Sequence, residues 1–217
     1  MRSRSLVILA AILSLGAGRL VAEQSVFASR LTAASRPALA RICSRISQDP
    51  VVEGTFTQTK HLKRLSKDFV SKGRFIFAVD RGILWDVRVP FPSTTVITRD
   101  RLVQRTPQGG TSVLDGSANP VFRRFADTLQ AVFSGNLKTI EEEFDLFFTD
   151  RGDASWRLGL VPKDSAMRAV VSTMEIGGDT SVREVLVSEA GEDTVRYSFS
   201  DVRTPAALTA DEEKLFF

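Results

Sequence analysis

The side chains that could perform chemistry are few, and His61 is the only histidine among them. It lies in the polar run Lys-His-Leu-Lys-Arg at residues 60–64, and a Ser–His–acid mechanism would depend on it. The sequence contains no Gly-x-Ser-x-Gly motif to supply a nucleophile. A single histidine also excludes a multi-histidine metal site. The pattern favours a solvated residue near the end of a strand, and a lipid hydrolase that uses His61 remains an alternative.

The acidic residues and glycines add no recognisable catalytic or cofactor motif. Residues 141–143 are a run of three glutamates, and Asp150 and Asp153 belong to a predicted hairpin turn without the spacing of a Ca²⁺ loop. No pair of carboxylates stands out as a glycosidase would require. Gly109-Gly110 lacks the lysine and the helix start of a phosphate-binding loop. We therefore expect a binding protein rather than an enzyme, with no metal and no cofactor.

Cys43 is the only cysteine, so the chain has no internal disulfide. It follows Ala-Arg-Ile and lies far from the apolar segment at the N-terminus, so it is not a lipidation signal. Its spacing from Leu39 and Ile46 is helical, which predicts a small buried hydrophobic side chain.

Residues 1–22 have the organisation of a cleaved secretory signal. Arg2 and Arg4 precede an apolar run at residues 6–17, and Ala22 offers a small residue for cleavage. The run is too short to span a bilayer, and Arg19 further disfavours the alternative of an uncleaved anchor. We expect export to the periplasm and a mature chain, residues 23–217, that forms one domain.

The charge of the mature chain argues against nucleic acid as a partner. Without the three arginines of the signal it has 26 basic and 26 acidic residues, so the sequence pI of about 9.3 largely reflects the signal. Basic residues outnumber acidic ones over residues 60–105, and the reverse holds over residues 141–217. The basic region is either a face for an acidic partner or anionic membrane, or the solvated surface of strands.

Strand patterns dominate the first half of the mature chain. Phe69, Phe75, Phe77 and Val79 share one parity, so they line one face of a strand. Residues between the strands form short turns, which predicts an antiparallel sheet with an apolar face that could hold an apolar ligand. The predicted strands of this half are residues 52–62, 69–79, 83–89, 94–98 and 102–105.

Two helices are predicted from caps and apolar stripes. The first starts near Pro37, carries Leu39, Cys43 and Ile46 on one face, and ends before Pro50. A glycine-rich loop at residues 107–116 precedes the second, which has Asn119 as N-cap and closes at Gly135. Residues 137–144 could continue as a short helical piece. The apolar face of the second helix is Phe122, Phe125, Leu129, Val132 and Phe133.

The second half is predicted to be a meander of hairpins, over residues 143–149, 155–161, 168–176, 182–187 and 194–201. Residues 214–217 are predicted as a last short strand or a hydrophobic tail. The whole is a mainly β protein with α: an antiparallel sheet of about 10 to 11 strands, strongly curved around an apolar interior. The helices would cover its open side, and a plain sheet-on-helix core without a cavity is the alternative.

A series of short motifs occurs in a fixed order along most of the mature chain. After an N-terminal helix come a Phe-x-Gln strand, a tryptophan strand ahead of a proline, a short hairpin, and a strand ending in Leu-x-Pro. In this order the sequence resembles the periplasmic outer-membrane lipoprotein carrier family (LolA-like proteins). The matching segments are Phe-Thr-Gln at residues 56–58, Gly-Arg-Phe at 73–75, Ile-Leu-Trp-Asp at 83–86 with Pro90, residues 96–102, Leu-Val-Pro at 160–162, and residues 195–199 with Leu208 and Phe216.

The resemblance implies an incomplete, strongly curved antiparallel barrel closed by helices, with an interior that takes the acyl chains of a lipoprotein. Release would need a second state in which the lid helix packs into the cavity. On this resemblance, the candidate residues of the cavity wall are Phe56, Phe75, Phe77 and Trp85. The candidate residues of the lid helix are Phe122, Phe125, Leu129 and Phe133.

In the family an arginine near the turn before the tryptophan strand bonds the lid when the cavity is empty. Arg81 is the nearest match, although Asp80 could equally occupy that position and Gly82 replaces the usual proline. The resemblance further implies a monomer that receives acylated cargo from an inner-membrane donor complex and passes it to an outer-membrane acceptor. A LolA-like sensor or structural partner that binds protein rather than carrying lipid remains the alternative.

Overall fold

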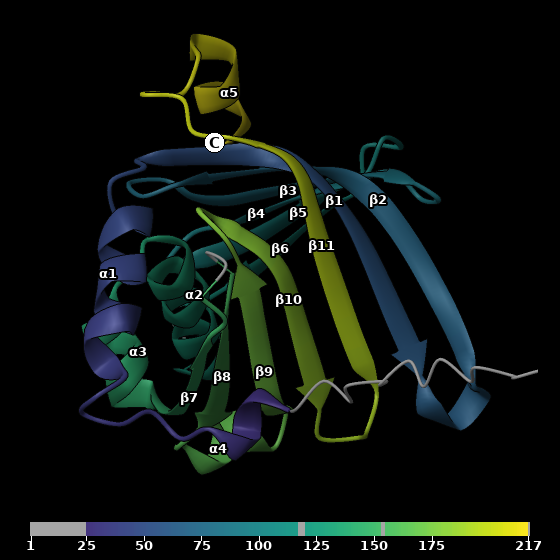
Figure 1. Ribbon diagram of the computed structural model, residues 1–217. Coiled ribbons are helices and arrows are strands. Elements are labelled where there is room, and N and C mark those ends of the chain that lie inside the picture. Colours follow the sequence, from purple (N-terminus) through teal and green to yellow (C-terminus); the bar gives the residue numbers. More distant parts are fainter. Residues whose placement is uncertain (1–24, 117–119, 153–154, 217) are drawn as a thin grey trace, which may run out of the picture.

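The computed structural model describes residues 25–116, 120–152 and 155–216. The predicted signal at residues 1–22 and the predicted N-cap Asn119 lie outside these residues. The described chain folds around one antiparallel sheet of 11 strands, and Figure 1 shows this sheet curling around a group of helices at one end. The predicted fold class, an incomplete curved barrel of antiparallel strands closed by helices, is confirmed.

The strands run in two consecutive meanders that meet in the middle of the sheet. Their order is β6-β5-β4-β3-β2-β1-β11-β10-β9-β8-β7, so the pairing of β1 with β11 joins the two halves. The strands β6 and β7 form the two outer edges, which is why the barrel stays open. The strands are β1 (Val51–Leu62), β2 (Lys67–Ala78), β3 (Gly82–Val89), β4 (Ser93–Ile97), β5 (Arg101–Arg105), β6 (Thr111–Asp115), β7 (Phe144–Asp150), β8 (Trp156–Pro162), β9 (Val171–Gly178), β10 (Val182–Glu189) and β11 (Thr194–Arg203).

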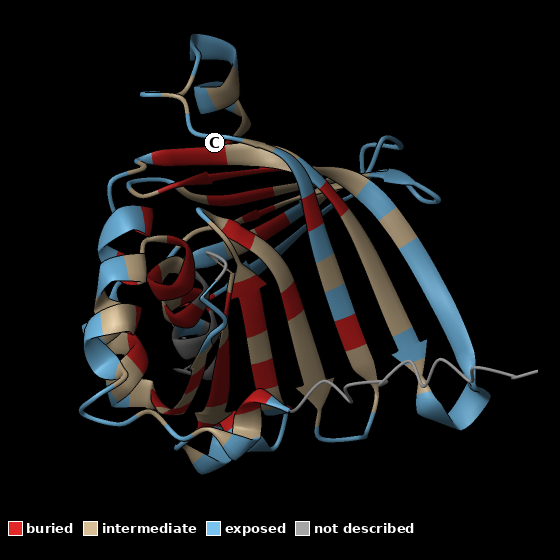
Figure 2. Ribbon diagram, in the orientation of Figure 1, coloured by how far each residue is buried: buried red, intermediate tan, exposed pale blue. Residues whose placement is uncertain are grey.

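The register of β1 places aromatic side chains on the concave face. Phe56 pairs with Phe199 in β11 and with Gly73 in β2. Because paired residues share a face, and alternate residues of β2 share it too, Phe75 and Phe77 point to the same side. Figure 2 shows buried segments of the strands near the helices, whereas the far end of β2 is largely exposed and that of β1 mostly intermediate.

The larger helices gather at one end of the curl (Figure 1). In α1 the predicted stripe Leu39, Cys43 and Ile46 is confirmed as buried. Gly135 follows α2 with φ +63°, and an added Cβ there would lie 2.2 Å from the carbonyl oxygen of Cys43, so the α2–α3 turn needs glycine. The helices are η1 (Val26–Ala28), α1 (Arg36–Ile46), η2 (Lys63–Leu65), α2 (Pro120–Phe133), α3 (Leu137–Glu143), α4 (Ser165–Arg168) and α5 (Ala210–Leu215).

Three local predictions are wrong. Residues 107–116 are not all loop, because residues 111–115 form the edge strand β6, whose five residues are all exposed and so lack the alternation that marks a strand. Residues 165–168 are the short helix α4, so the strand predicted from residue 168 begins at residue 171. The C-terminus is not a strand: Thr209 and Glu212 form a capping box that starts α5.

The C-terminal segment covers the outer face of the sheet. The ring of Phe216 is 3% exposed and packs in a second apolar cluster that includes Ile76 and Leu84, with Leu208 and Leu215 packed against it. Ile76 lies between Phe75 and Phe77 in β2 and therefore points away from the concave face. Both faces of β2 are thus buried near its end, the inner by helices and the outer by the C-terminal segment.

Candidate functional site

A largely apolar cavity of about 410 Å³ lies on the concave face of the sheet. One wall comes from β3 and β4, the floor from β1, β9, β10 and β11, and Phe133 of α2 closes one end. Its volume is within the range of roughly 300–1,000 Å³ that is usual for small-molecule sites. The lining residues are Gln58, Ile83, Trp85, Thr95, Ile97, Phe133, Val170, Val171, Met174, Val185, Val187, Glu189, Val195 and Tyr197.

Of the four predicted wall residues, only Trp85 lines this cavity. The other three, Phe56, Phe75 and Phe77, are at most 2% exposed and form the packed layer next to it. Trp85 stacks on Phe56 with ring centroids 4.0 Å apart, and its ring lies 6.1 Å from that of Phe75. The indole is therefore the boundary between the packed aromatic layer and the open space.

Phe133 of the predicted lid fills the closed end of the curl. Its ring stacks on Phe77 at 5.3 Å and lies 6.0 Å from the ring of Phe199. Because Phe133 also lines the cavity, its side chain separates the core from the open space. The side chains of Phe122, Phe125 and Leu129 lie outside the described residues, so their part in a lid stays a prediction.

Among the side chains of α2 that the structure describes, two make polar contacts with the sheet and its turns. The side-chain amide of Gln130 donates from Nε2 to the carbonyl oxygen of Val79, 2.9 Å away, just beyond the end of β2. Asp127 Oδ1 lies 3.6 Å from Nε of Arg99 in the turn between β4 and β5. The side chains of both ion-pair partners are exposed to solvent, so this second contact contributes little to the stability of the packing of α2 on the sheet.

Arg81 lies in the turn between β2 and β3. Its guanidinium Nη2 is 3.7 Å from Glu213 Oε1 in α5, on the outer side of the sheet, and this is its ion pair among the described residues. Gly82 has φ +112°, and an added Cβ would lie 2.2 Å from the carbonyl oxygen of Ile97. Proline cannot adopt that φ, which explains the glycine. The role of Arg81 as a lid latch stays a prediction.

One end of the cavity is polar, and its residues are not among the predicted wall and lid residues. Lys60 Nζ forms an ion pair with both carboxylate oxygens of Glu189, at 2.9 and 3.1 Å. Tyr197 lies nearby, and burial, followed by the charge of Glu189, raises the pKa of its hydroxyl to about 12. The strand pattern of β1 could have identified Gln58 and Lys60, because residues 56, 58 and 60 alternate along the strand and so share the face of Phe56.

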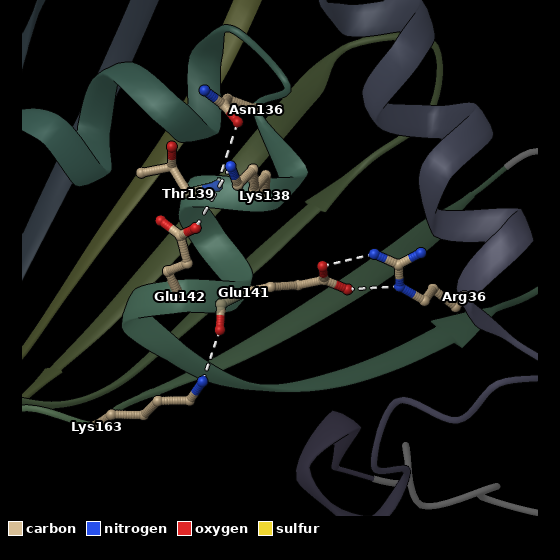
Figure 3. A network of polar contacts seen from close by, with 7 residues as sticks. All are labelled: Arg36, Asn136, Lys138, Thr139, Glu141, Glu142 and Lys163. Atoms are coloured by element: carbon tan, nitrogen blue, oxygen red, sulfur yellow. Dashed lines mark hydrogen bonds and ion pairs between the residues drawn. The ribbon is translucent and has the colours of Figure 1, made fainter.

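A second polar network fixes α3 against α1, and it is structural (Figure 3). Arg36 donates from Nε and Nη2 to the two carboxylate oxygens of Glu141, each at 2.7 Å. Lys163 donates to the carbonyl oxygen of Glu141 at 2.6 Å. The hydrogen bonds from Arg36 hold the pKa of Glu141 below its usual range. Burial, and then the charge of Glu141, raises the pKa of the Cys43 thiol to about 11.

His61 is not among the residues that line the cavity. Its Nδ1 lies 2.7 Å from Asp68 Oδ1, and both side chains are about half exposed. No three His, Cys, Asp or Glu side chains gather as a metal ion would require within the described part of the chain. A larger hollow of about 630 Å³ includes Arg81, Arg99, Arg101 and Asp127 in its lining, so it is charged and unsuited to an apolar ligand.

A curled antiparallel sheet with an apolar cavity under a helix is an architecture that can hold an apolar ligand. The model of the family described as "Outer membrane lipoprotein carrier protein LolA" matches residues 50–215, and the chain belongs to this family. A comparison with curated proteins finds no match. Among the described residues, no helix combines the length and the apolar character needed to cross a membrane.

Several solved structures are similar at low identity. The Pseudomonas aeruginosa MucA/MucB complex is 15% identical, with a TM-score of 0.48 over 82% of this chain and 60% of that chain. The LolA superfamily protein NE2245 from Nitrosomonas europaea is 8% identical, with a TM-score of 0.43 over 82% and 96%. LprF from Mycobacterium bovis is 10% identical, with a TM-score of 0.35 over 85% and 99%. TM-scores this low say nothing about what the chain binds.

Proposed function

We propose that the protein is a periplasmic carrier that binds an acyl chain of a lipoprotein or a related lipid in the cavity on the concave face. The observation that carries this proposal is the largely apolar cavity of about 410 Å³ between Trp85 and the β9–β11 floor, closed by Phe133. Membership of a family described as a lipoprotein carrier supports it.

The energetics of such a carrier fit a mostly apolar wall. Each methylene removed from water contributes about 0.8 kcal/mol, so an acyl chain needs contact along its length and few specific bonds. The packed rings of Phe77 and Phe133 occupy space that a longer or second chain would need. We propose that larger cargo displaces α2, which has two polar contacts with the sheet and its turns among its described side chains, and that the return of α2 helps to release cargo.

The signal predicted at residues 1–22 and the family together support a location in the periplasm, between an inner-membrane donor and an outer-membrane acceptor. Transfer between two membranes requires the acyl chain to cross water, and an apolar cavity shields the chain from water during that step. The donor, the acceptor and the acylated cargo belong to the proposal. A pull-down with the protein loaded with acylated cargo tests whether it has such partners.

Loading of cis-parinaric acid, a fluorescent fatty acid, tests the binding function. Val187→Trp fills the cavity with the volume of at least about two methylenes, so we expect roughly tenfold weaker loading. Leu186→Trp is the matched control, because residue 186 points to the opposite face of β10 and should leave loading unchanged. A folded wild-type protein that binds no acyl probe, by fluorescence and by native mass spectrometry, contradicts the carrier.

The alternative is a LolA-like protein that binds a protein partner without carrying lipid. The filled end of the curl favours it, because Phe56, Phe75 and Phe77 are buried in packed rings rather than lining open space. The same loading experiment separates the two. A protein that stays empty with all acyl probes, yet retains a protein partner in pull-down, supports the alternative.

A further inference from the structure

The polar end of the cavity contains two side chains whose hydrogen-bonding groups have no partner within the described residues. Gln58 in β1 and Tyr197 in β11 are directly paired across the two strands. Both line the cavity, so the amide and the hydroxyl face the same space. Both residues are partly buried, and a ligand head group that enters the cavity can replace water as the hydrogen-bond partner of this amide and hydroxyl.

These groups lie where the cavity changes from apolar to polar. Along β1 the residues facing the concave side are Phe56, then Gln58, then Lys60. The indole of Trp85 stacks on Phe56 on one side and meets the ring of Tyr197 edge-on at 5.3 Å on the other. An acyl chain lying against Trp85 therefore has its apolar part toward Phe133 and its head toward Tyr197.

The charges at this end determine which head group fits. Lys60 is already neutralised by the two-oxygen contact with Glu189, so it offers no free positive charge. A free carboxylate would approach the carboxylate of Glu189, and would lose its hydration without gaining a counter-ion. The ordinary pKa of tyrosine, about 10, already lies well above neutral pH, and burial and Glu189 raise that of Tyr197 to about 12, so its hydroxyl is protonated and can donate.

We propose that Gln58 and Tyr197 bind the ester or amide carbonyl of the acyl chain, and that the cavity thereby selects acyl chains in neutral ester or amide linkage over free fatty acids. This inference rests on the proposed function. A carbonyl oxygen accepts from the Tyr197 hydroxyl and from the Gln58 amide without adding a charge. Lipoproteins and membrane lipids carry their acyl chains in such linkages, so the selection suits a carrier of those molecules.

Two probes that differ only in the head group test this selection. cis-Parinaric acid and its methyl ester have the same fluorescent chain, and the acid is ionised at about pH 8 because its carboxyl pKa is far lower. We expect the wild-type mature protein to bind the ester at least about tenfold more tightly than the anion. Equal affinity for the two, or tighter binding of the anion, overturns the inference while the proposed function stands.

Variants assign the selection to the named groups. Tyr197→Phe and Gln58→Leu each remove one hydrogen bond, so each should weaken ester binding by roughly three- to tenfold and leave the anion within about twofold. Glu189→Gln should release Lys60 and strengthen anion binding by roughly tenfold. Thr57→Val, on the outer face of β1, is the control and should change neither affinity.

The outcomes distinguish a failure of the proposed head-group selection from a failure of acyl-chain binding itself. Ester binding that is unchanged in both Tyr197→Phe and Gln58→Leu overturns the inference. If Tyr197→Phe does not fold, as judged by circular dichroism, Gln58→Leu alone decides. Failure of the folded wild type to bind either probe contradicts the proposed function itself, and the inference with it.

Discussion

The side chain of Gln130 in α2 bonds to the backbone of Val79, 2.9 Å away, where the chain leaves β2. This bond joins the helix that covers the cavity to the strand that carries Phe75 and Phe77. It lies next to the β2–β3 turn, where the family comparison placed an arginine latch at Arg81. Among the described residues, Gln130 donates the hydrogen bond from α2 to the sheet, and Arg81 forms an ion pair with Glu213 of α5.

Gln130→Leu should loosen α2 without changing the cavity wall. The loss of one net hydrogen bond costs about 0.5–1.5 kcal/mol of unfolding free energy, measured by urea denaturation. If α2 moves during loading, the association rate of cis-parinaric acid should rise several-fold because the open state is more populated. The control is Lys138→Ala, whose side chain is 86% exposed. An unchanged rate in a destabilised Gln130→Leu protein means that α2 does not gate the cavity.

The Arg36–Glu141 pair should make stability depend on acidic pH. The pKa of Glu141 is lowered in the folded state, chiefly by its hydrogen bonds from Arg36. Its contribution is therefore present above the unfolded pKa of about 4.3 and disappears as pH falls through the lower folded value. Urea midpoints measured between about pH 7 and pH 3 should fall less steeply in Glu141→Gln than in the wild type. Equal slopes contradict the role of this pair.

Cys43 should resist thiol reagents in the folded protein. Its side chain is 6% exposed, and burial raises its pKa to about 11, so very little thiolate forms at neutral pH. Reaction with Ellman's reagent should be slow in buffer and rapid in concentrated urea. Rapid reaction in buffer, with the circular dichroism spectrum of the folded protein intact, shows that α1 opens away from the sheet.

Phe216→Ala should destabilise the fold but spare the cavity. The ring is buried in the cluster on the outer face, and truncation of a buried phenylalanine typically costs about 3–5 kcal/mol. Loading of cis-parinaric acid by the folded fraction should match the wild type, because residue 216 lies on the far side of the sheet from the cavity. Lys214→Ala, at an exposed position of α5, is the control for stability. Impaired loading in Phe216→Ala connects the outer cluster to the cavity.

Local pattern was sufficient for most of the fold. The alternation of Phe75 and Phe77 predicted a strand with one apolar face, and the stripe through Leu39 and Cys43 predicted α1, because both periods are visible in a few residues. The predictions were wrong where the sequence shows no apolar period. The strand β6 is exposed throughout, and its place comes from pairing with β5, whereas the helix α5 depends on a capping box rather than on an apolar stripe.

The sequence by itself determined the class of the site but not its position. It contained apolar faces, two covering helices and no catalytic set, and alternation was enough to say which side chains share a face. Only the tertiary structure decided that Phe77 packs under Phe133 while Trp85 borders open space, since that depends on where α2 comes to rest. The pairing of Gln58 with Tyr197 likewise requires β1 and β11 to meet from opposite ends of the chain. Contacts between segments so far apart are set by the closure of the whole sheet, which no local pattern encodes.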